Sequence, residues 1–145
     1  ANSLMICGAM LGVNVKICSP KGFAADSKIV EKAKSLSEFG SKISISNDPL
    51  KAMKDAQVIY TDVWASMGQE EEHLKRKKIF ENYKVDQKLI ELADEGAIIL
   101  HCLPAHRGEE ITEEALESKS SHVFDQAENR LHVQQALLAV QLGGI

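Results

Sequence analysis

The chain has 145 residues, with 44% apolar and 26% charged residues and a formal net charge of −4 at pH 7. This length suits one domain with a real core, and the acidic balance argues against a nucleic-acid surface, which needs clustered Lys and Arg. The apolar stretches fall far short of the roughly 20 residues that cross a bilayer, and three scattered cysteines indicate a reducing, cytoplasmic setting without a disulfide framework.

Short apolar runs alternate with helical patterns along the whole chain. The predicted helices span 3–11, 26–39, 49–54, 70–80, 86–93, 112–117 and 129–142, and the predicted strands span 13–18, 43–45, 58–61, 97–101 and 123–124. Such alternation favours parallel strands joined by helical crossovers, and continuous apolar strands fit a sheet covered on both faces. We therefore expect an α/β fold with a three-layer, doubly wound, mostly parallel, Rossmann-like sheet of about five strands.

The beginning of the chain lacks a strand that this fold would contain. Residues 1–4 have the pattern of a helix start, and no strand precedes that helix. In a doubly wound sheet the missing strand would be central. We therefore expect this chain to be a segment of a longer protein.

Three polar loops follow predicted strands, at 62–68, 101–108 and 125–130. In an open parallel sheet, ligands bind beyond the carboxyl ends of the strands. The three loops are therefore the first places to look for a functional site.

The loop 62–68 offers a carboxylate at Asp62, a hydroxyl at Ser66 and a glycine at Gly68. Such a set could bind an ammonium group and close over a ligand. Composition alone slightly favours a simpler interpretation, in which Ser66 caps the next helix and Trp64 belongs to the core. That next helix contains acidic and basic side chains in succession, which predicts a solvated face with i,i+4 charge pairs.

The segment 101–108 places a thiol and two imidazoles at a strand end. Cys102 could be a small buried hydrophobe, its commonest role, or a polar contact in a ligand pocket. His101, Cys102 and His106 could bind zinc, but spacings of one and four residues match no standard zinc finger, which disfavours this hypothesis. A catalytic Cys–His pair is disfavoured because neighbouring residues on a strand point to opposite faces.

The segment 125–130 ends with Arg130, which the predicted boundaries place in the first turn of the last helix. An arginine there opposes the helix dipole. It could pair with Glu128 or Asp125, or it could join the helix N-terminus in binding a phosphate or carboxylate. These two interpretations remain open at this point.

Taken together, the loops resemble the second, ornithine-binding domain of ornithine carbamoyltransferases of the bacterial and archaeal type. Residues 62–70 (Asp-Val-Trp-Ala-Ser-Met-Gly-Gln-Glu) are similar to the family's ornithine loop, and residues 101–104 (His-Cys-Leu-Pro) to its second signature. Residues 124–130 (Phe-Asp-Gln-Ala-Glu-Asn-Arg) are similar to the third, and residues 105–110 fit bacterial and archaeal members. The resemblance extends over essentially all of 1–145, and three motifs in order are far more specific than one.

The resemblance implies a site for ornithine. Asp62 would bind the α-amino group, and Ser66 and Met67 would contact the amino acid as their loop closes. Cys102 would lie beside the attacking side-chain amine. The implied reaction transfers the carbamoyl group of carbamoyl phosphate to the δ-amino group of L-ornithine, which yields L-citrulline and phosphate in arginine metabolism.

The resemblance also implies how carbamoyl phosphate is held. Cys102 and Leu103 would contact the carbamoyl group, and Arg130 would bind carbamoyl phosphate; Cys102 and Arg130 are thus the expected catalytic residues. Most phosphate ligands would belong to an N-terminal carbamoyl-phosphate domain that is absent from this chain, and the full enzyme would be a homotrimer or a multiple of trimers. Neither a metal nor an organic cofactor is implied.

Other functions stay open on sequence grounds. A carbamoyltransferase for another amine, such as putrescine, is the nearest alternative, although Asp62 favours an acceptor with an α-ammonium. An aspartate carbamoyltransferase would have proline in place of Cys102 and would lack the Ser-Met-Gly loop. A nicotinamide-dependent dehydrogenase needs a glycine-rich turn after a first strand, and a non-catalytic module could use the same scaffold.

Overall fold

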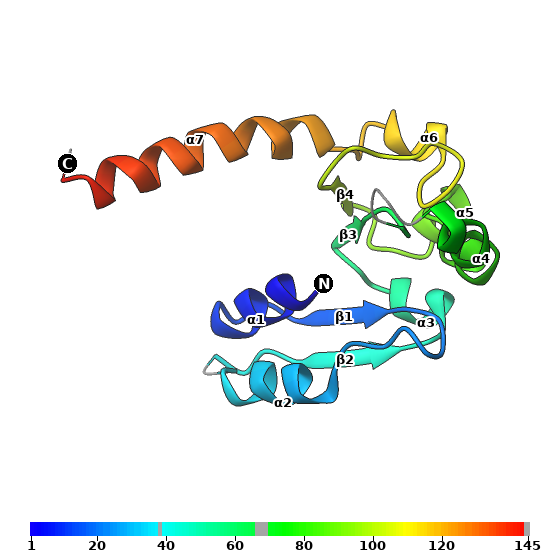
Figure 1. The fold of residues 1–145 in the computed structure, drawn as a ribbon, viewed down its shortest axis with the longest axis horizontal. Helices are drawn as coiled ribbons and strands as arrows, with labels where there is room; N and C mark the ends of the chain where they lie inside the picture. Colours follow the sequence, from blue (N-terminus) through cyan, green and yellow to red (C-terminus); the bar gives the residue numbers. More distant parts are fainter. Residues whose placement is uncertain (38, 66–69, 144–145) are drawn as a thin grey trace. The chain divides into compact units, whose positions relative to one another are not determined.

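The structure is a computed structural model that describes residues 1–37, 39–65 and 70–143 (Figure 1). The chain divides into two compact units, Ala1–Lys54 and Asp55–Ile145. Each unit combines a pair of parallel strands with helices. No helix in the described ranges has the length and apolar character needed to cross a membrane.

The first unit is built around one parallel strand pair. Its elements are α1 (Asn2–Met10), β1 (Val15–Cys18), α2 (Ser27–Ser35), β2 (Ile43–Ser46) and α3 (Pro49–Met53). Strands β1 and β2 pair in parallel, with Val15 opposite Ile43. Helices α1 and α2 pack their apolar sides together, and the buried cluster consists of Met5, Ala9, Ala33 and Ile43. The first unit thus has its own small core.

Side-chain caps explain where the helices of the first unit begin. The Asp26 carboxylate accepts a hydrogen bond from the Lys28 amide at 2.8 Å, and Asp48 accepts from Leu50 N at 3.1 Å at the start of α3. Helix α2 ends at Ser35, earlier than the predicted residue 39. Just beyond it, the Ser37 hydroxyl donates to the Ser41 carbonyl at 2.7 Å, and such local bonds compete with helical ones.

The second unit contains the other strand pair and the three candidate loops. Its elements are β3 (Val58–Thr61), α4 (Glu70–Phe80), the 3₁₀ helix η1 (Glu81–Tyr83), α5 (Gln87–Ile90), β4 (Ile98–His101), α6 (Glu113–Leu116) and α7 (Val123–Gln141). Strands β3 and β4 are parallel, with Thr61 opposite His101. The buried apolar side chains are Ile59, Ala65, Val85, Leu89, Ala97, Ile99, Ile111, Ala115, Leu116 and Val123. They fix the carboxyl ends of β3 and β4 at one edge.

The predicted strand 123–124 is wrong, because both residues lie in the first turn of α7. The extended backbone beside β4 comes slightly earlier. Ile99 N donates to the Ser120 carbonyl at 2.8 Å, and His122 N donates to the Ile99 carbonyl at 2.9 Å. The buried apolar side chain of Val123, which suggested a strand, instead anchors the start of a 19-residue helix.

The α/β class with parallel strands is confirmed. Among residues 1–37, 39–65 and 70–143 there are four strands in two parallel pairs, one pair in each unit, where about five strands were predicted. Strand β3 has the predicted bounds, and β4 differs from its prediction only by starting one residue later. The two strands that Asp62 and Cys102 follow are therefore among the elements that the sequence predicted best, whereas the start of α7 was predicted six residues too late.

Candidate substrate site after strands β3 and β4

Asp62 and Cys102 meet at the carboxyl edge of the β3–β4 pair. Each residue directly follows its strand, and the register places the last strand residues, Thr61 and His101, opposite each other. The Cys102 thiol donates a hydrogen bond to Asp62 Oδ1 at 3.0 Å, and Val63 N donates to the same oxygen at 2.8 Å. Asp62 is exposed, and its Oδ2 accepts no hydrogen bond from the described residues. One carboxylate oxygen is therefore available to a cationic ligand.

The Cys102 thiol is a hydrogen-bond donor and not a thiolate. Partial burial raises its pKa above the usual value, and the hydrogen bond to Asp62 and the charge of that carboxylate raise it further. Reactive cysteines have the opposite environment, since nearby cations lower their pKa. Cys102 is therefore suited to contacting a ligand and poorly suited to acting as a nucleophile.

A fully buried pair, His101 and Glu110, lies beneath the segment that contains Cys102. Leu103 N donates to His101 Nδ1 at 2.8 Å, so the imidazole proton is on Nε2, which donates to Glu110 Oε1 at 3.2 Å. The same Glu110 oxygen accepts from His106 N at 2.5 Å. Because Leu103 has a φ of 53°, a region that L-residues rarely adopt, these bonds hold a conformation that costs about 1–2 kcal/mol.

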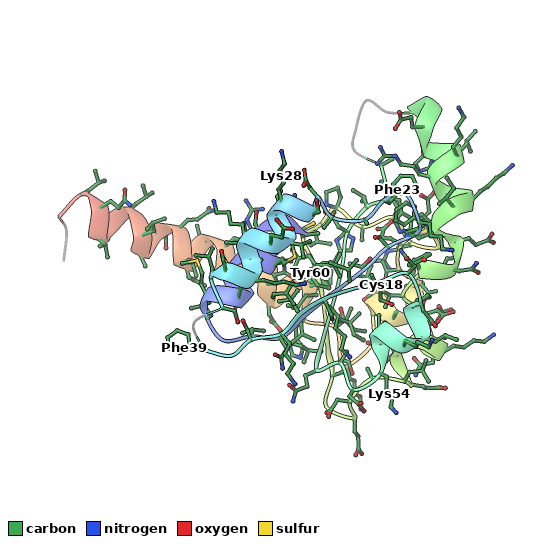
Figure 2. All side chains as sticks on the ribbon, turned by 90° about the horizontal axis from the view of Figure 1, so that it is seen from below. Cys18, Phe23, Lys28, Phe39, Lys54 and Tyr60 are labelled. Carbon is green, nitrogen blue, oxygen red and sulfur yellow. The ribbon has the colours of Figure 1, made fainter. Side chains whose placement is uncertain are left out.

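Gln126 joins both strands to helix α7. Its Oε1 accepts from His101 N at 3.0 Å, and its Nε2 donates to the Tyr60 hydroxyl at 3.1 Å. Burial raises the pKa of Tyr60, against the opposing effect of the Gln126 hydrogen bond, so the phenol remains neutral near pH 7. Figure 2 labels Tyr60 among the side chains of the chain. Gln126 thereby sets the position of α7 relative to the strand ends.

Arg130 does not lie in the first turn of the last helix, which corrects the predicted boundary. Helix α7 begins at Val123, so Arg130 is its eighth residue and does not adjoin the helix N-terminus. Arg130 is exposed and forms no ion pair with other described residues; the suggested partners Asp125 and Glu128 contact His122 and His132 instead. Arg130 follows Gln126 by four positions, and residues so spaced share one side of a helix.

Two of the expected ligand residues, Ser66 and Met67, lie outside the described residues. The residues before them are placed. Trp64 is half-buried, with its ring 5.9 Å from that of Phe80, and its carbonyl accepts from Arg76 Nη1 at 3.1 Å. Helix α4 thus packs against the start of the loop, and most of its described residues from 72 to 80 are exposed. The predicted i,i+4 pairing is present between Glu72 and Arg76 at 2.8 Å.

The structure gives no support to zinc binding by His101, Cys102 and His106. His101 is buried and directs both ring nitrogens to protein groups, Leu103 N and Glu110. A different group could hold a metal: His73, His106 and Glu109 have their ligand atoms within 4.8 Å of one another. This group was not predicted from the sequence, because His73 lies 33 residues before His106, in a helix whose pattern indicated only a charged surface.

Residues 1–141 match the family model described as "Aspartate/ornithine carbamoyltransferase, Asp/Orn binding domain". The chain belongs to this family. Ornithine carbamoyltransferase of Prochlorococcus marinus is 63% identical over 144 residues, which cover 99% of this chain and 45% of that protein. The ornithine carbamoyltransferase structure from Pyrococcus furiosus has a TM-score of 0.94 at 50% identity and covers 100% of this chain and 47% of its own.

A solved structure with lower sequence identity has a different name. The structure of N-acetyl-L-ornithine transcarbamylase has a TM-score of 0.82 at 28% identity, and the match covers 96% of this chain and 44% of that chain. The chain spans about half the length of the curated relatives it matches. The family and its fold are thus established for this chain.

Proposed function

We propose that the protein containing this chain transfers the carbamoyl group of carbamoyl phosphate to the δ-amino group of L-ornithine, which yields L-citrulline and phosphate. The observation that supports this most directly is the Asp62–Cys102 contact at the carboxyl edge of β3 and β4. This contact places two groups at the edge of the sheet where ligands bind: a carboxylate, one oxygen of which is available, and a neutral thiol. Relatives over 50% identical have the name ornithine carbamoyltransferase.

In this proposal Asp62, Cys102 and Arg130 each bind a different part of the two substrates. Asp62 binds the α-ammonium group of ornithine through its free Oδ2, and Ser66 and Met67 contact the amino acid. Cys102 and Leu103 lie beside the reacting groups. Arg130, one helical turn beyond Gln126, binds the phosphate of carbamoyl phosphate, to which a guanidinium forms charge-assisted hydrogen bonds.

The reaction needs orientation and charge placement more than a protein nucleophile. The neutral δ-amine attacks the carbonyl carbon, the bond from that carbon to the phosphate oxygen breaks, phosphate leaves, and the nitrogen loses a proton. Holding both substrates at this geometry supplies much of the rate enhancement, and hydrogen-bond donors stabilise the developing oxyanion. The high pKa of Cys102 fits a thiol that contacts the amine without forming a covalent intermediate.

Ornithine is a better acceptor candidate than N-acetylornithine or putrescine. An α-ammonium group complements the Asp62 carboxylate, whereas an acetylated α-amine has no charge and putrescine has no α-amino acid group. The relatives support the same choice. Those named ornithine carbamoyltransferase are up to 63% identical to this chain, whereas the structure named N-acetyl-L-ornithine transcarbamylase is 28% identical. We therefore retain ornithine as the acceptor.

The protein would need a second domain and would act as an oligomer. We propose that an N-terminal carbamoyl-phosphate domain provides the other phosphate contacts, that the enzyme is a homotrimer or a multiple of trimers, and that it works in the cytoplasm without a cofactor. The segment from 1 to 145 would be its ornithine-binding domain. The match of this chain to about 45% of its relatives' length supports a division of the site between two domains.

Substitution of Asp62 tests the proposed function. In the protein at its native length, Asp62→Asn preserves the shape and removes the charge, so kcat/KM for ornithine should fall about 30- to 900-fold, which corresponds to about 2–4 kcal/mol. The KM for carbamoyl phosphate should change little. Citrulline formation at varied ornithine concentration measures both values.

Glu114→Gln is the matched control, because Glu114 is also an exposed carboxylate of the second unit, lies outside the three candidate loops and forms no ion pair with described residues. It should leave citrulline formation unchanged. Near-wild-type ornithine kinetics in Asp62→Asn would show that this carboxylate does not bind the acceptor.

A further inference from the structure

Two histidines and a carboxylate converge where helix α4 meets the segment after β4. His73 is in α4, and His106 and Glu109 are in that segment; their ligand atoms all lie within 4.8 Å of one another. His73 Nε2 is 2.8 Å from Glu109 Oε2, and the two imidazole rings are nearly perpendicular with centroids 6.3 Å apart. We propose that His73, His106 and Glu109 bind a divalent transition-metal ion, with Zn²⁺ the best fit.

The chemistry of these side chains selects the class of metal. Two imidazoles and one carboxylate suit zinc and similar ions, whereas magnesium and calcium prefer oxygen ligands only. Zinc forms bonds of about 2.0–2.2 Å to such atoms, so tetrahedral ligands lie roughly 3.3 Å apart. The ligand atoms, all within 4.8 Å of one another, would reach that value by side-chain rotation, and His106 is exposed. A water molecule would complete the coordination.

Glu109 directs both of its carboxylate oxygens at nitrogen atoms of neighbouring side chains. Lys77 Nζ contacts Oε1 at 3.0 Å, and His73 contacts Oε2 at 2.8 Å. A metal ion would take the place of the proton between His73 and Oε2, and Lys77 would compete with it through its positive charge.

The alternative to a metal site is an ion pair that joins α4 to the segment after β4, formed by His73 and Lys77 with Glu109. Such an ion pair would not need His106. Other histidines of the second unit pair with one carboxylate each, as His122 does with Asp125 and His132 with Glu128. Only around Glu109, among the described residues, does a second imidazole join such a pair. The ring of His106 makes no hydrogen bond within the described parts of the chain, so its nitrogens are available to a metal.

A metal at this position would connect the two parts of the candidate substrate site, the loop that contains Asp62 and the segment that contains Cys102. Helix α4 follows the loop that contains Asp62, and His106 N donates to Glu110, which with His101 supports the segment of Cys102 and Leu103. The ion would therefore fix α4 to that segment. It takes no part in carbamoyl transfer, and its role is structural or regulatory.

Zinc binding by the protein at its native length tests the proposal. The chelator-treated, dialysed protein is titrated with Zn²⁺ alone, in competition with a chromophoric chelator, and with Co²⁺ to record the visible absorption of a tetrahedral site. We expect one ion per chain. His73→Asn, His106→Asn and Glu109→Gln should each weaken zinc binding at least about tenfold, since each removes one protein ligand.

Three further variants distinguish this metal site from a metal-free ion pair between α4 and Glu109, and from zinc binding elsewhere in the protein. His122→Asn and Cys102→Ser should leave zinc affinity unchanged, because neither residue belongs to the group. Lys77→Gln should strengthen zinc binding, since it removes the competing charge, whereas a metal-free ion pair predicts no gain. Thermal melting in the presence of chelator verifies that each variant is folded, and His106→Asn should be the least perturbed because its ring is exposed.

The proposal is overturned if the wild-type protein binds no stoichiometric Zn²⁺, or if folded His73→Asn and His106→Asn variants bind it as tightly as the wild type. It is equally overturned if Cys102→Ser removes zinc binding, because the ion would then lie in the substrate site. Weaker binding in Lys77→Gln would also contradict it. All of these measurements are made without substrates and do not depend on the proposed reaction.

Discussion

Asp62 and Cys102 are the residues whose placement followed most directly from the sequence. Both come immediately after predicted parallel strands, and parallel strands bring their carboxyl ends to one edge. The hydrogen bond between them could not be predicted, because it depends on the register of β3 and β4 and on the rotamers of both side chains. The effect of Asp62 on the pKa of Cys102 could not be predicted from the sequence for the same reason.

The raised pKa of Cys102 predicts slow alkylation with a defined pH dependence. Burial, the Asp62 hydrogen bond and the Asp62 charge all favour the protonated thiol, and only the thiolate reacts. At pH 8, iodoacetamide should modify Cys102 more slowly than an unperturbed thiol, and the rate should rise as the pH increases through the raised pKa. Asp62→Asn should accelerate the reaction at pH 8.

Peptide mass spectrometry distinguishes the three thiols of the chain, with the exposed Cys7 as the internal reference. The rate at Cys7 should not respond to Asp62→Asn. If Cys102 reacted faster than Cys7 at pH 8, or more slowly after Asp62→Asn, it would not be a neutral hydrogen-bond donor to Asp62.

At the scale of elements, capping residues made the starts of several helices predictable. The apolar pattern at 123–124, in contrast, wrongly predicted a short strand. Asp26, Asp48, Asp86 and Thr112 each accept a hydrogen bond from the first turn of the helix that follows, as their residue types suggest. At 120–124 the local pattern failed. A buried Val beside Phe has strand character, yet the backbone already turns helical there because its pairing with β4 ends at His122.

The segment from β4 to α6 should depend on Glu110 for its stability. Glu110→Ala would leave the buried Nε2–H of His101 and the amide of His106 without their acceptor. The loss of buried hydrogen bonds and the resulting cavity should lower the free energy of unfolding by about 2–4 kcal/mol. Glu110→Gln retains an acceptor oxygen at the same place and should restore much of this loss.

Urea unfolding of the protein at its native length measures these differences. Glu114→Ala is a suitable control, since Glu114 is exposed in α6 and forms no ion pair with described residues. Equal stability of Glu110→Ala and the wild type would mean that the His101–Glu110 pair does not support this segment.

At the scale of the whole molecule, α7 has the features of a helix that another part of the protein covers. Several of its large apolar side chains are more than half exposed, namely Phe124, Leu131, Val133, Leu137, Leu138 and Val140. The helix contacts β4 near its beginning and then extends away from the β3–β4 pair (Figure 1). Exposed apolar surface of this kind commonly marks an interface, which fits the second domain proposed above.

The isolated chain should therefore form no citrulline. It contains Arg130 as a candidate phosphate ligand, and the loss of several other charge-assisted contacts, each worth roughly 1.5–3 kcal/mol, should abolish useful binding of carbamoyl phosphate. Residues 1–145 expressed alone are assayed with ornithine and carbamoyl phosphate. Activity should appear when the proposed N-terminal carbamoyl-phosphate domain is supplied, in the same chain or as a partner, and turnover by the purified segment would contradict the proposed division of the site.

The continuous helix α7 also has a mechanical consequence. Its base is fixed by the buried Val123 and by Gln126, which is bonded to both strands, while the apolar side chains of its later turns are exposed among the described residues. A helix of 19 residues is about 28 Å long. Acting as a lever, it would convert a tilt of about 5° at its base into a displacement of about 2.5 Å at its tip. Any small tilt at the strand ends would thus be enlarged at the part of the protein that the tip of α7 contacts.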